Sequence, residues 1–248
     1  MHLITRLCSL LLLGLFLGTA HAQDAKSYQP VTDERLLHPE PENWLMYRGT
    51  YNSWGYSPLD QITTKNVKKL VPAWTFSTGV EEGHQSPPIV NNGVMFITTP
   101  KNQVLALDAR TGDLLWRYRR ELPEDLFQLH PTNRGVALYG DKVFLATVDA
   151  HLLALNARTG EVVWDQTVEN YLTGYYMTLA PLVAKGKVMV GMSGGELGIR
   201  GFIQAFDAET LDQVFRITKQ VIGLPARTGF GHETGKLAIR RGFARDAA

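Results

Sequence analysis

The sequence predicts an all-β fold, an incomplete β-propeller with about three four-stranded blades. The main observation is a pattern that occurs three times, as LALDARTGDLLW (105–116), LALNARTGEVVW (153–164) and QAFDAETLDQVF (204–215). Its equivalent positions Asp108, Asn156 and Asp207 recur about every 50 residues, a period typical of propellers and other repeat arrays. The second observation is a hairpin signal before each copy. Each repeat therefore contains the four short strands of one blade.

Each part of the repeated pattern has a physical role. The alternating residues before the Asp or Asn predict a strand, and that side chain can accept backbone N–H groups in a tight turn. Gly112 and Gly160 supply the positive φ that closes the turn. The next strand contains Trp116 or Trp164, and we expect both rings to be buried between neighbouring blades.

The hairpins before the three motifs define the extent of the blades. Their turns are predicted at Asn91-Asn92-Gly93, Tyr139-Gly140-Asp141 and Lys185-Gly186-Lys187. The blades are accordingly expected over residues 72–119, 134–168 and 178–217, although Leu211 and Phe215 replace the Gly and the Trp in the third motif. A β-sandwich with coincidental turns is the alternative, and the near-equal spacing of three motifs argues against it.

The N-terminal region has the features of a cleaved secretory signal over residues 1–22. A short basic start, an apolar run from Leu7 to Leu17 and the string Ala20-His21-Ala22 precede Gln23. The apolar run is too short for a membrane span, and no later stretch is long enough either. We therefore expect an exported, periplasmic protein. Its N-terminal segment, 23–71, leads into the propeller (72–217) and ends in a predicted short helix over residues 59–70.

Composition and charge exclude several classes of protein. Hydrophobic residues make up 44% and charged residues 20%, which predicts a packed core. A net charge of +1 argues against nucleic acid as a partner. Cys8 is the only cysteine and lies within the signal, so the mature chain holds no disulfide and no thiolate metal site. The basic tail 218–248 lacks the repeat and is expected to be disordered or the product of a shifted reading frame, with a nucleic-acid or membrane arm as the alternative.

Several strings resemble those of the PQQ-dependent (quinoprotein) alcohol dehydrogenases. They are WLMYRGTYNSWGYSPLDQI (44–62), LVPAWTFSTGV (70–80), NRGVALYGDKVFLATVDAHLLALNARTG (133–160) and YYMTLAPLVAKGKVMVGMSGGELGIRGFIQAFDAET (175–210). The similarity is collinear from about Trp44 to Ile217, and SGGELGIRGF is specific to this family among propellers. The resemblance implies part of an eight-bladed, quinoprotein-type propeller with PQQ on its axis and Ca²⁺, or a lanthanide, against the quinone.

The resemblance also implies which residues meet the cofactor. Arg134 would hydrogen-bond PQQ, and Thr178 with Ser193, Gly194 and Gly195 would meet its polar edge and carboxylates. Glu196 would be a metal ligand. These residue types suit a flat tricarboxylate, which needs a cation and hydrogen-bond donors, and a hard metal ion, which binds carboxylate oxygen. Without the resemblance, the same positions read as a surface Arg, a strand-starting Thr, a glycine turn and a solvated carboxylate.

Three departures from the family pattern affect the site. Gln85 stands where relatives often have Glu, so its bond to the quinone edge would be neutral. Relatives often carry two adjacent, disulfide-linked cysteines where this chain has Gln128-Leu129. In the family, the ring-stacking Trp, the further metal ligands and the catalytic Asp come from later blades. No catalytic residue is therefore assigned in this fragment.

The resemblance implies oxidation of a small primary alcohol to an aldehyde, with electrons passing to a periplasmic cytochrome c. Because only part of the site is matched, we expect the isolated chain to be an inactive N-terminal fragment. Two alternatives remain: a non-catalytic β-propeller that serves as an assembly scaffold of the cell envelope, and one part of a split enzyme completed by a second polypeptide.

Overall fold

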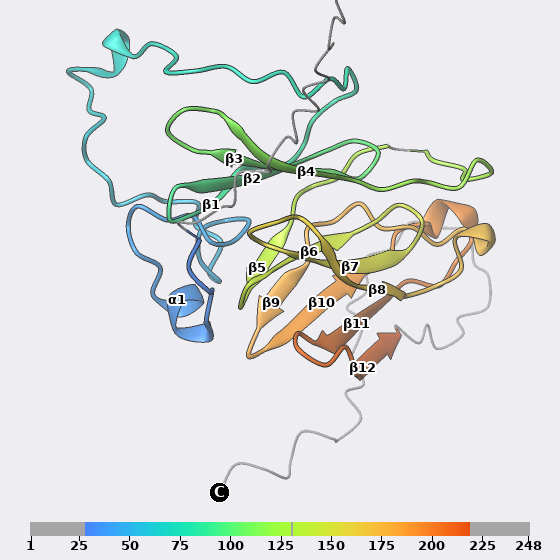
Figure 1. Cartoon of the computed structure of the whole chain (residues 1–248). Coiled ribbons are helices and arrows are strands. Elements are labelled where there is room, and N and C mark those ends of the chain that lie inside the picture. Colours follow the sequence, from blue (N-terminus) through green and yellow to red (C-terminus); the bar gives the residue numbers. More distant parts are fainter. Residues whose placement is uncertain (1–27, 130, 219–248) are drawn as a thin grey trace, which may run out of the picture.

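The computed structural model describes residues 28–129 and 131–218, and these residues contain three four-stranded antiparallel sheets (Figure 1). Blade 1 consists of β1 (Ile89–Asn91), β2 (Val94–Thr99), β3 (Gln103–Asp108) and β4 (Leu114–Arg119). Blade 2 consists of β5 (Ala137–Tyr139), β6 (Lys142–Ala146), β7 (His151–Asn156) and β8 (Val162–Thr167). Blade 3 consists of β9 (Leu182–Ala184), β10 (Lys187–Gly191), β11 (Phe202–Asp207) and β12 (Gln213–Thr218). Each strand pairs with the next along the chain within its blade, which confirms the predicted fold class of three four-stranded blades.

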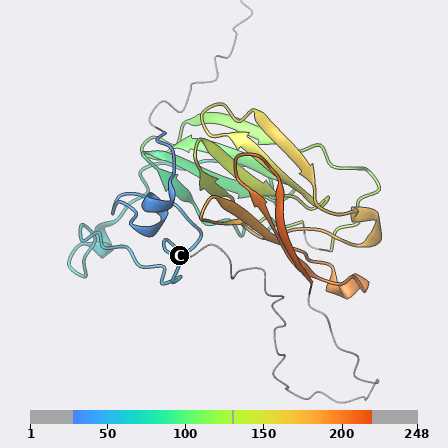
Figure 2. The ribbon, with the colours of Figure 1, turned by 90° about the horizontal axis from the view of Figure 1, so that it is seen from below.

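Blade 2 lies between the other two blades (Figures 1 and 2). Its central strands are therefore covered on both faces, and Phe144, Leu145 and Leu153 have no exposed surface. Strands buried on both faces read as continuous apolar runs, which explains the sequences of β6 and β7. Burial in blade 3 alternates along β10, where Val188 and Val190 are buried and their neighbours are partly exposed.

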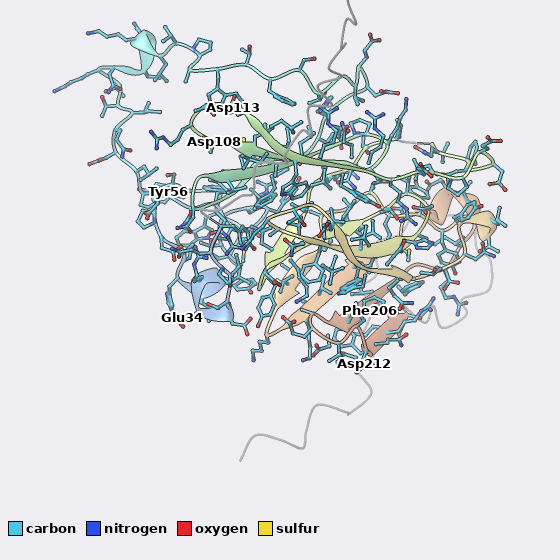
Figure 3. The ribbon with its side chains drawn as sticks, in the orientation of Figure 1. Glu34, Tyr56, Asp108, Asp113, Phe206 and Asp212 are labelled. Carbon is cyan, nitrogen blue, oxygen red and sulfur yellow. The ribbon has the colours of Figure 1, made fainter. Side chains whose placement is uncertain are left out.

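The repeated Asp or Asn closes the outer turn of every blade in the predicted way. In blade 1 the Oδ1 atom of Asp108 accepts the backbone N–H groups of Arg110 and Thr111, at 2.8 and 3.1 Å. The same pair of bonds recurs at Asn156, at 2.8 and 3.2 Å, and at Asp207, at 2.9 and 3.1 Å. Figure 3 shows Asp108 and Asp113 flanking this turn in blade 1. The turn is thus a local structure set by the sequence.

The Trp of one repeat docks on the turn of the next. Trp116 is 4% exposed, and its indole N–H donates to the carbonyl of Ala157 at 3.0 Å. A Cβ atom at Gly160 would lie 2.5 Å from the Trp116 ring, so only glycine leaves room for it. The prediction of a buried Trp is confirmed for Trp116, whereas Trp164 is only partly buried.

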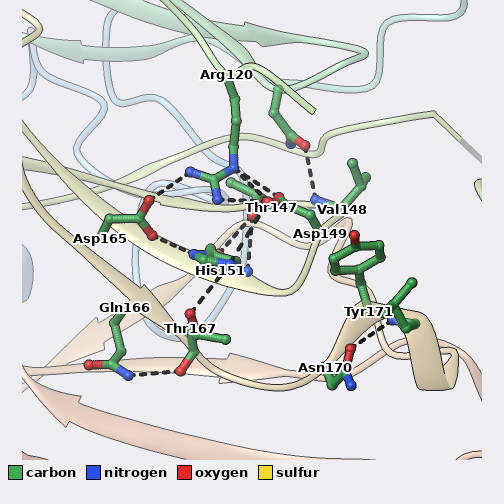
Figure 4. Close-up of polar contacts among 12 residues, drawn as sticks. Arg120, Thr147, Val148, Asp149, His151, Asp165, Gln166, Thr167, Asn170 and Tyr171 are labelled. Carbon is green, nitrogen blue, oxygen red and sulfur yellow. Dashed lines mark hydrogen bonds and ion pairs between the residues drawn. The ribbon is translucent and has the colours of Figure 1, made fainter. Parts of the chain in front are cut away.

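Blades 1 and 2 are also joined by a cluster of charged side chains (Figure 4). Arg120 follows β4 and donates to both carboxylate oxygens of Asp149, at 2.6–2.9 Å, and to Asp165 at 2.9 Å. His151 lies 2.5 Å from the other oxygen of Asp165. Burial alone would lower the pKa of Arg120, but its bonds to the two aspartates outweigh burial and raise that pKa, so Arg120 stays charged.

The N-terminal segment is attached to blade 1 through a short helix, α1 (Asp33–Leu37). Thr32 caps this helix by accepting the N–H of Arg35 at 3.3 Å. The Arg35 side chain binds Glu40 at 2.7 and 3.0 Å and also donates to Asn91 and Asn92 in the first hairpin. We did not predict this helix, although Thr followed by two acidic residues is an N-terminal helix signal.

The predicted helix over residues 59–70 is wrong. This stretch is an extended, exposed arm whose only helical turn is the 3₁₀ helix η1 (Val67–Lys69), and Figure 3 places Tyr56 on the arm outside the sheets. The side chain of Asn66 accepts the N–H of Thr63 and donates to the carbonyl of Gln61, both at 2.7 Å. Such local side-chain bonds compete with helix formation. Residues 72–88 also contain no strand, so regular structure in blade 1 begins at Ile89.

The predicted signal (1–22) and most of the predicted tail (218–248) lie outside the described residues. Within residues 28–129 and 131–218, no helix combines the length and the apolar character that a membrane span requires.

Candidate functional site

The predicted cofactor residues come from segments that meet at one end of the three blades. Gln85 lies before β1, Arg134 before β5 and Thr178 before β9. A Cβ atom added at Gly135 would lie 3.5 Å from the Ser86 Oγ and 3.7 Å from the Ala180 Cβ, so the three segments are in contact. The structure therefore brings together residues from three repeats.

Arg134 and Thr178 form a direct pair. The Arg134 Nη1 donates to the Thr178 Oγ1 at 2.5 Å, and its backbone N–H donates to the Thr178 carbonyl at 3.0 Å. Thr178 is only 5% exposed. Asn133 holds this segment in place, because it donates to the carbonyl of Ala146 and accepts the N–H of Gly135, both at 2.9 Å. The NRG string thus positions a guanidinium beside a buried hydroxyl. Gln85 is exposed.

The SGGE string forms a second loop beside this pair, in the connection between β10 and β11. Ser193 pairs with Tyr176 as an isolated bridge, with the Ser193 N–H donating to the Tyr176 carbonyl at 2.9 Å. Gly194 has a φ of +115°, and a Cβ there would lie 2.1 Å from the carbonyl oxygen of Gly174. This glycine is therefore required by contact between two loops of the protein. A Cβ at Gly195 would meet nothing within 4 Å, so this position borders open space.

Glu196 is exposed and lies in the 3₁₀ helix η3 (Gly195–Leu197). Its carboxylate accepts a hydrogen bond from the hydroxyl of Tyr176. Burial and the Glu196 carboxylate raise the pKa of Tyr176 to about 12, while the guanidinium of Arg134 acts in the opposite direction. The Tyr176 hydroxyl therefore keeps its proton at neutral pH, and Arg134 is close enough to influence it. Sequence reasoning missed Tyr176, because nothing in the YYMTLAP string distinguishes its two tyrosines.

A cavity of about 330 Å³ lies beside Leu197, the residue that follows Glu196. It is lined by Tyr176 and Leu197 together with Phe127 and residues 171–175, among them η2 (Tyr171–Thr173). In Figure 1, η2 and η3 are the gold and orange turns at the end of the sheets away from α1. A larger cavity of about 780 Å³ is bordered by Glu82, Lys101 and Arg120. None of the predicted site residues lines either cavity, and we place the site beside the smaller one because Tyr176, in its lining, pairs with Ser193 and bonds Glu196.

Residues 44–219 match the PQQ family described as "Glucose/ethanol/alcohol dehydrogenase, beta-propeller domain". The chain belongs to this family. It is 42% identical over 200 residues to the quinoprotein alcohol dehydrogenase PedH of Pseudomonas putida, which covers 79% of the chain and 32% of PedH. It is 41% identical over 210 residues to a quinoprotein ethanol dehydrogenase of Pseudomonas putida, covering 80% of the chain and 33% of that protein.

Solved structures of the family confirm the predicted fold class. A europium-containing methanol dehydrogenase superimposes with a TM-score of 0.71 at 37% identity, covering 75% of this chain and 34% of that one. The quinohemoprotein alcohol dehydrogenase of Comamonas testosteroni superimposes with a TM-score of 0.72 at 36% identity, covering 79% and 30%. The chain therefore spans about a third of the length of the relatives it matches.

The side chains at this end fit the polar edge of PQQ. A tricarboxylate needs a cation and hydroxyl donors, and Arg134, Thr178 and Ser193 provide these groups. For a metal ion the fit is limited to one ligand, the carboxylate of Glu196, because the described residues hold no group of three or more His, Cys, Asp or Glu suited to a metal. Ca²⁺ usually takes about six to eight oxygen ligands.

Proposed function

We propose that this chain forms one side of a PQQ site and serves the oxidation of a small primary alcohol to an aldehyde. The observation that supports this most is the contact among three repeats at one end of the blades. There Arg134, the buried hydroxyl of Thr178 and the Ser193–Glu196 loop lie together. A propeller with no cofactor has no need of a guanidinium fixed on a buried hydroxyl at this position.

Each residue has a stated task in this proposal. The guanidinium of Arg134 binds a carboxylate of the cofactor, and Thr178, whose oxygen already accepts from Arg134, donates its own proton to the cofactor edge. Ser193 adds a second hydroxyl, and Gln85 a neutral contact at the quinone edge. Glu196 supplies one oxygen ligand to Ca²⁺ or a lanthanide. When bound, PQQ with its metal supplies the electron-accepting group that the protein side chains lack.

The cellular setting is part of the same proposal. The signal features of residues 1–22 support export to the periplasm. A periplasmic cytochrome c would then be the electron acceptor, by analogy with the family. Two of the similar proteins are named as quinohemoproteins.

We further propose that the isolated 248-residue chain binds PQQ without turnover. Among the described residues, Glu196 is the one candidate metal ligand at the site, and no side chain there is assigned as the base for the alcohol proton. A second polypeptide could complete the site, and the outer face of blade 3 favours this arrangement. Ile203 and Ile217, paired across β11 and β12, are 53% and 45% exposed on that face.

The test is a titration of the purified chain with PQQ, followed by quenching of tryptophan fluorescence. Arg134→Ala should weaken binding about 10- to 100-fold, as expected for a lost hydrogen bond between charged groups. Arg110→Ala is the matched control, because Arg110 is an exposed arginine of the outer turn in blade 1, and it should leave binding unchanged. Equal affinity of the wild type and Arg134→Ala would refute the site. A dye-linked assay with a primary alcohol should show no turnover, and PQQ-dependent turnover would refute the second proposal.

A further inference from the structure

We propose that Thr167, His151 and Asp165 form a nucleophile, base and carboxylate triad that hydrolyses small neutral carboxylic esters. The three side chains share one face of the hairpin of β7 and β8 (Figure 4). His151 pairs directly with Thr167, and Asp165 precedes Thr167 by two residues on β8, a spacing that returns a side chain to the same face. None of these residues belongs to the proposed PQQ site, so the two functions can be tested separately.

The contacts of His151 give its ring the tautomer that a general base needs. The Nδ1 atom lies 2.5 Å from the Oδ1 of Asp165. An ionised carboxylate only accepts hydrogen bonds, so Nδ1 carries the proton and donates. In the neutral ring Nε2 then holds a lone pair, and it lies 3.4 Å from the Thr167 Oγ1. The Thr167 hydroxyl therefore donates to Nε2, which is the arrangement of a nucleophile beside its base.

Asp165 is the positioning residue of this triad. Its other oxygen, Oδ2, accepts from Arg120 at 2.9 Å. Burial alone would raise the pKa of Asp165, but its bonds to Arg120 and His151 outweigh burial and lower that pKa, so the carboxylate is ionised at neutral pH. Asp149 is 4.0 Å from the His151 Nε2, and Arg120 binds both of its oxygens. Asp149 is therefore too distant to replace Thr167 as the hydrogen-bond partner of Nε2.

A cavity of about 370 Å³ gives an ester access to the triad. It is lined by His151, Thr167 and residues 168–171. Thr167 is exposed and the side chain of His151 is 23% exposed, so both can be reached from solvent. Among the described residues that line this cavity there is no Lys or Arg, whereas Glu169 is acidic. This lining disfavours an anionic acyl group and suits a neutral one.

Asn170 supplies a donor for the oxygen that becomes negative during the reaction. It lines the same cavity, and its Oδ1 accepts the N–H of Leu172 at 3.0 Å, which fixes the amide group at the start of η2. With Oδ1 engaged, the amide nitrogen is the group that this side chain offers to a ligand. A side-chain amide in this role typically contributes about 10²–10³ in rate.

The reaction balances with water as the only co-reactant. The Thr167 Oγ forms a bond to the ester carbonyl carbon while its proton moves to the His151 Nε2. The bond from that carbon to the alcohol oxygen then breaks, and the alcohol leaves with this proton. Water attacks the acyl-threonine, the carboxylic acid is released, and a proton from the water returns to Thr167 through His151.

The experiment is hydrolysis of p-nitrophenyl acetate by the full chain without PQQ, with the acetylated residue located by peptide mass spectrometry. The wild type should carry the acetyl group on Thr167. Thr167→Ala and His151→Asn should each lower the rate at least about 10-fold, and the double variant no further, because the two residues act as a unit. Thr167→Ser keeps the hydroxyl and should retain activity. Thr159→Ala is the matched control, since the Thr159 hydroxyl bonds Glu161 in the outer turn, and it should leave the rate unchanged.

Two further variants test the supporting residues. Asn170→Asp keeps an oxygen for the Leu172 N–H but removes the amide donor, so it should lower the rate at least about 10-fold. Asp165→Asn should lower the rate and move the ring proton of His151 to Nε2, which the ¹⁵N shifts of the ring report and a loss of packing alone would not produce. An unchanged tautomer in Asp165→Asn would overturn its positioning role, and an unchanged rate in Asn170→Asp would overturn the donor assignment.

The triad itself has two decisive outcomes. Equal rates for the wild type, Thr167→Ala and His151→Asn would overturn it. Acetyl groups on other residues of the wild type and none on Thr167 would overturn it as well, and this result does not depend on whether any variant folds.

Discussion

The junction between blades 1 and 2 and the junction between blades 2 and 3 use the same repeated pattern, yet they bind their tryptophan differently. At the first junction, the indole N–H of Trp116 donates to Ala157, and the ring covers Gly160. At the second, the indole N–H of Trp164 is buried without a hydrogen-bond partner among the described residues. The glycine position there is occupied by Leu211, at a φ of +71°. The two junctions thus differ both in this turn residue and in the docking hydrogen bond.

The charged contacts at the two junctions differ in the same direction. At the first, the side chains of Arg120 and Asp149 are 10% and 4% exposed, so their pairing is largely shielded from water. At the second, the side chain of Lys142 is 11% exposed, but the carboxylate of Glu209 that it binds is 60% exposed. Water screens a pair with one exposed partner, and surface pairs typically contribute about 0–1 kcal/mol. The first junction is therefore expected to be the stronger one.

Of the substitutions that compare the two junctions, Trp116→Ala should lower the free energy of unfolding most. It removes a ring that is 4% exposed together with its hydrogen bond, and the expected loss of unfolding free energy is about 3–5 kcal/mol. Trp164→Ala should cost clearly less, since that ring is partly exposed and its N–H is already unpaired. Urea unfolding of both variants measures the difference. Equal losses would mean that the junctions are equivalent.

Arg120→Ala should destabilise the first junction almost as strongly. The substitution leaves the buried carboxylate of Asp149 without its partner, and breaking such a pair typically costs about 3–5 kcal/mol. Lys142→Ala at the second junction should cost about 1 kcal/mol or less, because the partner carboxylate there is exposed. Thermal unfolding of the two variants provides the measurement. A larger loss for Lys142→Ala would contradict the proposed ranking of the junctions.

Gly160→Ala tests the docking contact with a single methyl group. The new Cβ would lie 2.5 Å from the Trp116 ring at a φ of +77°, so crowding adds to backbone strain. We expect a loss of about 2–4 kcal/mol, from left-handed strain of about 1–2 and overpacking of about 1–3 kcal/mol. Gly93→Ala, at a φ of +79° with open space around it, is the control for strain alone. Similar losses in both variants would exclude a role for the Trp116 contact.

Leu211→Gly should strengthen the second junction. Glycine relieves a left-handed leucine and gives the third motif the turn residue of the other two, so that Trp164 can dock as Trp116 does. A gain of about 1 kcal/mol is expected, the usual size of one net hydrogen bond. Calorimetry should then show a higher unfolding temperature. A decrease would indicate that Leu211 makes compensating contacts.

The pH dependence of the first junction should have a definite sign. Burial alone would raise the pKa of Asp165, but its bonds to Arg120 and His151 outweigh burial and lower that pKa below its usual 3.8. The stabilisation is therefore fully present above about pH 4 and is lost as the pH falls through the lower folded-state pKa. Asp165→Asn should flatten this acid limb in unfolding measurements between about pH 6 and pH 2. If Asp165→Asn loses stability at low pH as the wild type does, other carboxylates cause that loss.

Much of the fold follows from local sequence. The three turns at Asp108, Asn156 and Asp207 are closed by side chains two and three residues away, so their pattern is readable without a structure. The same locality made the hairpins predictable. Local sequence gave the wrong prediction for residues 59–70. There the side chain of Asn66 bonds the nearby backbone instead of allowing a helix, and composition does not tell which of these two local structures forms.

The sequence by itself determined the repeat, the blades and, through its resemblance to a family, the residue types of the site. Only the tertiary structure decided how those residues are held. In the folded protein Arg134 donates to the hydroxyl of Thr178, and the Tyr176 hydroxyl donates to Glu196. The carbonyl of Gly174 lies so close to Gly194 that only glycine fits at position 194. The tertiary structure also left the Trp164 N–H without a partner among the described residues. Most of these contacts join segments about 20 or more residues apart, and their geometry arises from packing between loops and blades, which no local pattern encodes.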